Sequence, residues 1–185
     1  MKALSLLLLT FGLTFSAWAK PVGGVNLPDT LTALDTSLVL NGAGIRTKWW
    51  IKLYVGGLYL KKASQDAKMI VDSDEAMAIR LHIISSHITN EKMEAAVREG
   101  FQKSMNGNIT PLQVEIEQIL SVFKETIKED DVFEMLYLPG QGVNMSKNQV
   151  FKINVKGLEF KKALFGIWLS HNPVDSDLKE EMLGE

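Results

Sequence analysis

The sequence predicts an α+β fold, in which an antiparallel sheet carries helices on one face. Segments with strand-like alternation come in runs, and segments with helical periodicity come in runs between and after them. The regular strand–helix–strand alternation that favours a parallel sheet is absent. The chain has 185 residues, enough for one domain with a sizeable core even without a short leader.

Residues 1–19 have the pattern of a signal peptide. Lys2 is followed by an apolar stretch from Leu4 to Trp18, and the run Ala17-Trp18-Ala19 provides small residues at a cleavage site. The stretch is shorter than the roughly 20 residues that span a bilayer, and no later segment comes near that length. We therefore expect a single domain over residues 20–185, exported to the periplasm and not stably inserted in a membrane. A retained N-terminal anchor is the alternative.

Composition excludes several classes of function. The chain contains no cysteine, so disulfides, thiolate metal sites, thiol nucleophiles and a lipoprotein anchor are excluded. Its net charge is −2 and it has no basic stripe, which argues against nucleic-acid binding. The three histidines show no metal-binding spacing, and the chain has neither a Gly-x-Ser-x-Gly elbow nor a complete dinucleotide fingerprint. We expect no metal and no cofactor.

The segment from Leu38 to Leu60 predicts a hairpin of two extended segments joined by a short polar turn. Glycines stand where a strand normally places side chains, at Gly42, Gly44, Gly56 and Gly57. A strand glycine often marks a bulge or the close approach of a ligand or another backbone. Because Arg46 directly follows the first glycine pair, the pattern suggests a pocket for an anion. The alternative for Arg46 is a surface position beside Lys48 at the hairpin turn.

The other elements follow from periodicity and turn residues. Alternation predicts further strands at 77–84, 132–138, 143–145 and 149–155, with turns at 139–142 and 146–148. One helix begins near Thr89 and ends before Asn106-Gly107. A second begins with a capping box of Thr110 and Gln113 and carries an apolar stripe as far as residue 127. Helices are also expected at 158–169 and 175–183, with an irregular lead-in at 20–28 and a solvated end at 180–185.

Two motifs resemble a known family. The run Asn41-Gly-Ala-Gly-Ile-Arg46, followed by Ile51-Lys-Leu-Tyr-Val-Gly-Gly-Leu-Tyr-Leu60, is similar to the signature of the chalcone isomerase-like superfamily. The segments 162–169 and 175–178 are similar to the closing part of that family. The exported, cysteine-free form resembles its bacterial branch. The resemblance implies an open-faced β-sandwich, with a long antiparallel sheet covered by a helical layer and a ligand cleft between them.

The resemblance also suggests functions and site residues. Plant members close a chalcone into a flavanone, and other members bind fatty acids or assist partner enzymes. The catalytic arginine of the enzymes matches Arg46, whereas their strand threonine falls at Tyr54. Their catalytic tyrosine falls near Lys92 or Met93, and their asparagine falls near Glu99. Only the arginine is unchanged, which weakens the case for chalcone cyclisation.

The leading hypothesis is a non-catalytic binder of a small amphipathic anion such as a fatty acid. Arg46 would hold the carboxylate and Tyr54 would donate a second hydrogen bond, with Lys92 nearby. The glycines Gly42, Gly44, Gly56 and Gly57 would make room for the ligand. One alternative is an isomerase of an unsaturated carbonyl compound, in which Arg46 stabilises an enolate and Lys92 or Tyr54 handles the proton. The other is an interaction module of the cell envelope; no protein partner is indicated.

Overall fold

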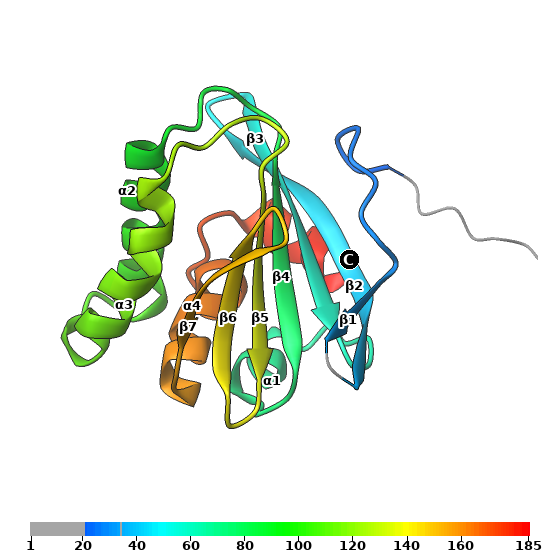
Figure 1. The fold of residues 1–185 in the computed structure, drawn as a ribbon. Helices are drawn as coiled ribbons and strands as arrows, with labels where there is room; N and C mark the ends of the chain where they lie inside the picture. Colours follow the sequence, from blue (N-terminus) through cyan, green and yellow to red (C-terminus); the bar gives the residue numbers. More distant parts are fainter. Residues whose placement is uncertain (1–20, 34) are drawn as a thin grey trace, which may run out of the picture.

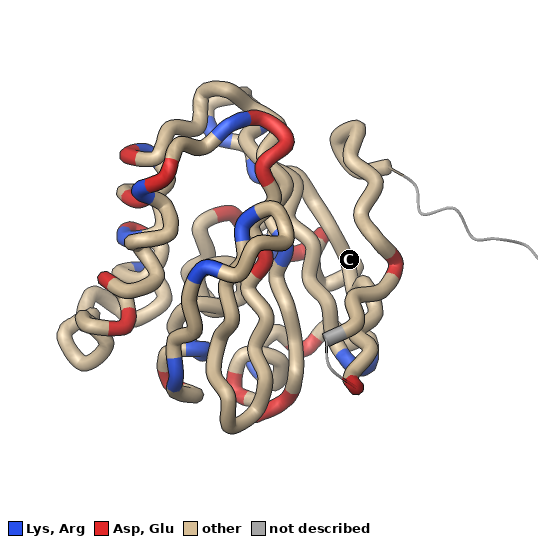
Figure 2. The backbone as a smooth tube through the Cα atoms, in the orientation of Figure 1, with Lys and Arg blue, Asp and Glu red and all other residues tan. Residues whose placement is uncertain are grey.

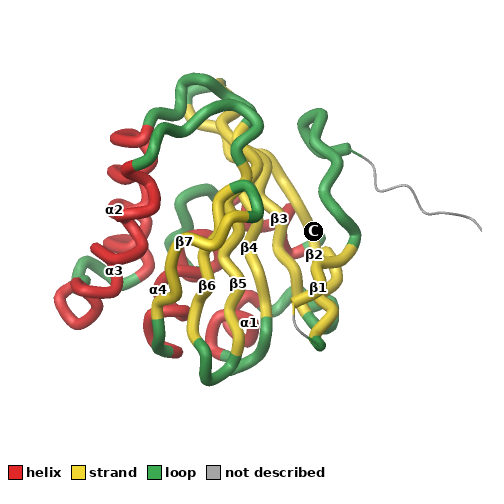
Figure 3. The backbone as a smooth tube through the Cα atoms, viewed as in Figure 1, coloured by secondary structure: helices red, strands yellow, loops and turns green. Residues whose placement is uncertain are grey.

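The computed structural model describes residues 21–33 and 35–185, so the predicted signal peptide lies outside the described residues. Seven antiparallel strands form one sheet in chain order, and helices cover one of its faces (Figures 1 and 3). The strands are β1 (Thr30–Ala33), β2 (Thr36–Lys48), β3 (Ile51–Leu60), β4 (Met77–Ile83), β5 (Val132–Leu138), β6 (Gly142–Lys147) and β7 (Val150–Val155). The helices are α1 (Ala67–Asp72), α2 (Asn90–Ser104), α3 (Gln113–Leu120), α4 (Leu158–Leu169) and α5 (Ser176–Leu183). The predicted α+β architecture is confirmed.

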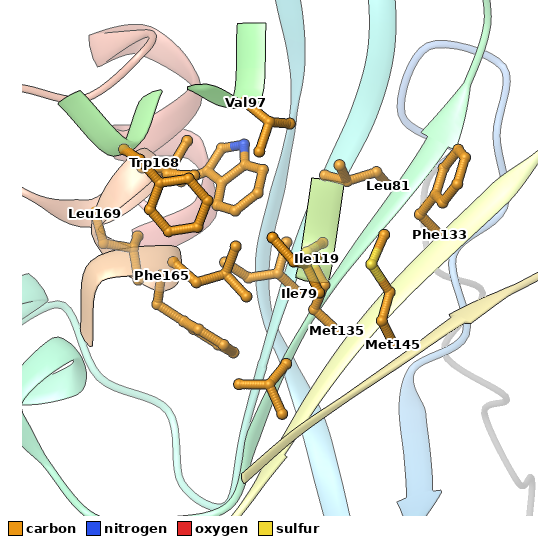
Figure 4. Close-up of a cluster of buried hydrophobic side chains, with 14 of the residues drawn as sticks. Ile79, Leu81, Val97, Ile119, Phe133, Met135, Met145, Phe165, Trp168 and Leu169 are labelled. Carbon is orange, nitrogen blue, oxygen red and sulfur yellow. The ribbon is translucent and has the colours of Figure 1, made fainter. Parts of the chain in front are cut away.

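The main core lies between the sheet and the helices. Alternate residues of β4 and β5 face it, which confirms the predicted strand pattern; among them are Ile79, Leu81 and Phe133, each at most 1% exposed. Helix α4, predicted with its observed limits, places Phe165 and Trp168 against them (Figure 4). Since side chains alternate along a strand, the other residues of β4 lie on the opposite face of the sheet.

The outer face of the sheet is partly covered by the N-terminal segment. Residues 21–29 are irregular, as predicted, but Val25 and Leu27 are buried and pack against Val55 of β3. The hydroxyl of Tyr59 donates to the carbonyl of Pro28 at 3.0 Å. Tyr54 belongs to the main core instead, so the two tyrosines of β3 lie on opposite faces.

Two predicted helix features differ from the structure. Thr110 caps no helix: residues 110–112 form a 3-10 turn whose N-cap, Ile109, makes no side-chain hydrogen bond. The α-helix that follows ends at Leu120 and continues only as a second 3-10 turn over Ser121–Lys124. The apolar stripe is nevertheless buried through Ile116 and Phe123, because a 3-10 turn still brings every third residue to the core.

The C-terminal segment is packed against the sheet, so the predicted solvated end was wrong. Met182 and Leu183 of α5 are buried, and the Glu181 carboxylate accepts a hydrogen bond from the backbone N–H of Ile45 at 3.0 Å. Asn41 also donates from its side chain to the carbonyl of Met182 at 3.0 Å. Helix α5 therefore lies directly on β2.

Gly42 and Gly44 permit this close packing. A Cβ at Gly42 would lie 2.7 Å from the Met182 carbonyl oxygen and 2.8 Å from the Gly184 nitrogen. A Cβ at Gly44 would lie 2.6 Å from the Cβ of Glu181. The sequence was therefore correct in predicting a close approach at these glycines. The approaching group is helix α5. The expectation that Gly42 and Gly44 make room for a ligand was therefore wrong.

The turn between β2 and β3 is not the polar turn that the sequence suggested. Lys48 pairs with Ile51, so the two turn residues are Trp49 and Trp50. Both have positive φ angles, 49° and 64°. The turn between β6 and β7 consists of Asn148 and Gln149, so it begins two residues later and ends one residue later than predicted.

Lys161 joins α4 to α1 inside the protein. Its side chain is fully buried, and Nζ donates to the carbonyl oxygens of Ile70, Val71 and Ser73 at 3.0, 2.9 and 2.7 Å. These carbonyls lie at the C-terminal end of α1, where a cation is favourable. Burial lowers the pKa of Lys161 to about 8, against the opposing charge of Asp74, which raises it.

Replacing Gly42 by Ala should destabilise the fold, because the new methyl group would meet the backbone of α5. We expect a loss of about 1–3 kcal/mol in the free energy of unfolding, measured by urea denaturation. Gly56→Ala is the matched control: its Cβ would lie 3.4 Å from Leu178 Cδ1, an ordinary contact. Equal stability of both variants would contradict the packing role of Gly42.

Stability should also depend on pH through Lys161. Below about pH 8 the folded and unfolded states both carry the proton, so the cost of burying the charge is fully present. From about pH 8 to the ordinary value of 10.5, only the unfolded chain keeps the proton, so the free energy of unfolding rises with pH. The rise is at most about 3 kcal/mol. Urea denaturation at several pH values should show it in the parent but not in Lys161→Met; parallel curves would contradict it.

Candidate functional site

A cavity of about 450 Å³ lies between the sheet and two helices, near the turn of the β2–β3 hairpin. Its walls come from β2, β3, β4, α2 and α4, and most of the lining is apolar. The apolar lining residues are Trp49, Ile51, Leu53, Leu81, Ile88, Met93, Ala95, Ala96, Val97, Ile167, Trp168 and Val174. Figure 4 shows Val97, Trp168 and Leu81 in the space between helices and sheet. Such a cavity has the size and character of a small-molecule site.

Arg46 and Tyr54 form a cross-strand pair in the wall of this cavity. They are directly opposite one another in β2 and β3, so both side chains project from the same, helix-covered face. The pairing register shifts just after Arg46, which leaves Leu53 as an extra residue on β3. Because of this bulge, Leu53 and Tyr54 both contribute to the lining.

Arg46 is held by α5. Its Nη1 donates to Oδ2 of Asp175 at 2.7 Å, and the two side chains are only 16% and 13% exposed. Asp175 is also the N-cap of α5, because its Oδ1 accepts from the backbone N–H of Leu178. Within residues 21–33 and 35–185, Nε and Nη2 of Arg46 have no hydrogen-bond acceptor. The ion pair therefore fixes the guanidinium while leaving donors for another anion.

Tyr54 provides the cavity with a hydrogen-bond donor. Its hydroxyl oxygen accepts a hydrogen bond from Trp168 Nε1 at 3.0 Å. Burial raises the pKa of Tyr54, against the hydrogen bond from Trp168 and the charge of Arg46, which lower it. The hydroxyl is therefore protonated at neutral pH. Since its oxygen is already an acceptor, the O–H remains available to donate to a ligand.

The rim of the cavity carries further polar groups. Lys92 lies in the first turn of α2 and donates from Nζ to the carbonyl of His87 at 3.1 Å. Lys48 and His87 also line the rim. Glu99, at the position suggested by the family asparagine, lies in the lining and pairs with Lys103 at 3.2 Å.

The structure thus brings together three of the predicted ligand-binding residues, Arg46, Tyr54 and Lys92. That they bind a ligand stays a prediction. Gly42 and Gly44 lie beneath α5 and are not part of the cavity lining. Gly56 is also outside it, next to Leu178 and Leu81, and so is Gly57, next to Leu27 and Tyr59.

Sequence analysis missed Trp168 and Asp175 as partners of the site. Trp168 was covered only as part of the expected helix at 158–169; it is buried, and its N–H donates to the Tyr54 hydroxyl. Asp175 was noted as the start of a helix and as part of the family-like segment 175–178, without a partner. A capping aspartate followed by an amphipathic turn indicates the start of a helix. It does not indicate that the aspartate pairs with an arginine 129 residues away.

Two further kinds of site were searched for in the described part of the chain. No group of three or more His, Cys, Asp or Glu side chains is placed to hold a metal ion. None of the helices there is both long and apolar enough to cross a membrane.

Comparisons with known proteins agree with this architecture. The crystal structure of a fatty-acid binding protein from Arabidopsis thaliana is similar in fold, with a TM-score of 0.68 and 17% sequence identity. The match covers 86% of this chain and 92% of the Arabidopsis chain. No curated protein matches the sequence significantly. The model of the chalcone isomerase-like family, however, matches residues 19–184. Since this match spans nearly the whole sequence, the protein belongs to the chalcone isomerase-like family.

Proposed function

We propose that the protein binds a small amphipathic carboxylate, with a fatty acid as the best fit, in the cavity between sheet and helices. One observation carries the proposal: hydrogen-bond donors of Arg46 and Tyr54 line a cavity whose other walls are mainly apolar. A charged head and an apolar tail are the two features that such a cavity would recognise.

The polar end suits a carboxylate. Arg46 Nε and Nη2 can donate charge-assisted hydrogen bonds, which are stronger than those between neutral groups. The Tyr54 hydroxyl supplies a neutral donor on the neighbouring strand. Asp175 neutralises part of the arginine charge, but the lysines at the rim, Lys48 and Lys92, add positive charge. The site can therefore accept an anion without leaving it unpaired.

The apolar end suits a flexible chain. Leu81, Val97 and Ile167 provide a wall of branched side chains, and Met93 adds an adaptable one. The volume of about 450 Å³ is within the range of about 300–1,000 Å³ common for small-molecule sites. The shared fold with the Arabidopsis fatty-acid binding protein supports this ligand class.

Binding is favoured over turnover. An isomerase would need a group to handle a proton, and the expected candidates were Lys92 and Tyr54. Lys92 Nζ donates to the His87 carbonyl at the rim. Burial raises the pKa of Tyr54, which disfavours loss of its proton. Arg46 and Tyr54 alone provide charge stabilisation, which is sufficient to hold a carboxylate.

We also propose that the protein belongs to an exported bacterial branch of the family and acts in the periplasm. The support is the pattern of residues 1–19, with an apolar stretch and a small-residue cleavage site. Intact mass measurement of the protein from a periplasmic extract tests this: a chain beginning at Lys20 is expected, whereas a full-length chain in the cytoplasm would contradict it.

The carboxylate should be recognised through Arg46. We expect the parent to bind a long-chain fatty acid about 10- to 100-fold more tightly than its methyl ester, which has the same tail but no charge. In Arg46→Gln this preference should largely disappear. Isothermal titration with both ligands measures the effect, and native mass spectrometry gives the stoichiometry.

The comparison of acid and ester separates ligand recognition from folding, because loss of the Arg46–Asp175 pair also affects stability. Arg98→Gln is the matched control: it removes one arginine of α2 that pairs with Glu117 and does not line the cavity. An unchanged preference for the acid in Arg46→Gln would contradict the proposed role of Arg46. Absence of binding by the parent would reject the fatty-acid proposal itself.

A further inference from the structure

Two exposed tryptophans form the tip of the β2–β3 hairpin. Trp49 is 78% exposed and Trp50 is 95% exposed, and the adjacent Ile51 is 37% exposed. Tryptophan is a large apolar residue that is highly buried on average. Packing in the core therefore does not explain why two tryptophans lie at a protruding turn.

The backbone conformation of the tip does not explain the presence of the two tryptophans either. Two-residue hairpin turns with positive φ at both positions favour Asn and Gly, because those residues adopt this conformation at low cost. Bulky residues rarely adopt it, and such unfavourable conformations tend to occur at functional sites. Trp49 and Trp50 adopt it at φ angles of 49° and 64°. The hairpin requires a turn here, but it does not require tryptophan.

Two lysines flank the tip. Lys48 precedes the tryptophans and Lys52 follows Ile51; both are exposed, and within the described part of the chain neither has a carboxylate partner. Lys48 Nζ lies 5.3 Å from the centre of the Trp49 ring. Three carboxylates line the hollow beside Trp49 and Trp50. Two of them are engaged with β2, Asp175 with Arg46 and Glu181 with the Ile45 N–H, and the third is Asp177. Figure 2 shows acidic residues at this end of the molecule too, in the loop that leads into β5.

The tip also borders the cavity. Lys48, Trp49 and Ile51 line it together with Arg46, and the hairpin turn lies at the same end of the molecule as the loop that leads into α2 (Figure 1). A molecule that entered the cavity from this end would pass the tryptophans.

We propose that this tip docks on the surface of an anionic lipid bilayer, with the indoles of Trp49 and Trp50 at the level of the headgroups. Tryptophan is enriched at membrane interfaces because its ring is apolar but carries an N–H donor. Lysines near the surface are attracted to anionic headgroups. The contact is superficial, since the described residues include no helix able to cross the membrane.

A lipid surface fits the tip better than a protein partner does. The two indoles offer roughly 300–500 Å², whereas a stable protein interface buries about 800 Å² on each side. A narrow, convex turn is poorly suited to a broad complementary surface, but it can enter the soft headgroup layer of a bilayer without a matching shape.

The test is co-flotation of the full-chain protein with vesicles of phosphatidylcholine and phosphatidylglycerol, and with vesicles of phosphatidylcholine alone. Trp50→Gly should lower the partition coefficient about tenfold, because it removes an indole while placing a residue suited to the turn. Lys52→Gln should lower it about fivefold on the anionic vesicles only. If residues 1–19 remain attached, their apolar stretch adds the same background to every variant.

Phe151→Ser is the control: Phe151 is an aromatic residue of edge strand β7, also exposed, at 61%, and its loss should leave flotation unchanged. Equal flotation of the parent and Trp50→Gly would overturn the proposal. So would a dimer of the parent, seen by sedimentation and abolished by Trp50→Gly, without vesicle binding. The vesicles contain no fatty acid, so either result is independent of the proposed ligand.

Discussion

The close contact between helix α5 and strand β2 is the constraint on which the candidate site depends. It exists because two alternate positions of β2, Gly42 and Gly44, carry no side chain on the face that α5 covers. With α5 at this distance, its N-cap residue Asp175 reaches the guanidinium of Arg46. That ion pair orients Arg46 beside Tyr54. The glycines thus act on the cavity indirectly, through the position of a helix.

Much of the fold could be predicted because its signals are local. Alternation gave β4 and β5, and helical periodicity with a clear start and end gave α2 and α4. Short elements such as β1 and α1 were missed because four to six residues carry little periodicity. The second predicted helix was too long, since an apolar stripe at helical spacing does not distinguish an α-helix from successive 3-10 turns. The packing of the C-terminal segment depends on β2, which is distant in sequence.

The site could be predicted only where neighbouring strands define it. Arg46 and Tyr54 belong to one hairpin, so a short stretch of sequence was sufficient to place them together. Trp168 and Asp175 are 114 and 129 residues from their partners, and no local pattern indicates those contacts. For the glycines, the sequence indicated that something approaches closely but not what approaches. The distinction between a ligand and a helix required the three-dimensional structure.

The hydrogen bond between Trp168 and Tyr54 gives the cavity a built-in optical reporter. The indole of Trp168 is buried at 3% exposure, whereas those of Trp49 and Trp50 are in solvent, so their emission differs in wavelength and in access to aqueous quenchers. A ligand that accepted a hydrogen bond from the Tyr54 hydroxyl would make its oxygen a stronger acceptor for the indole N–H. Binding at the proposed site should then change the emission of Trp168, without an added label.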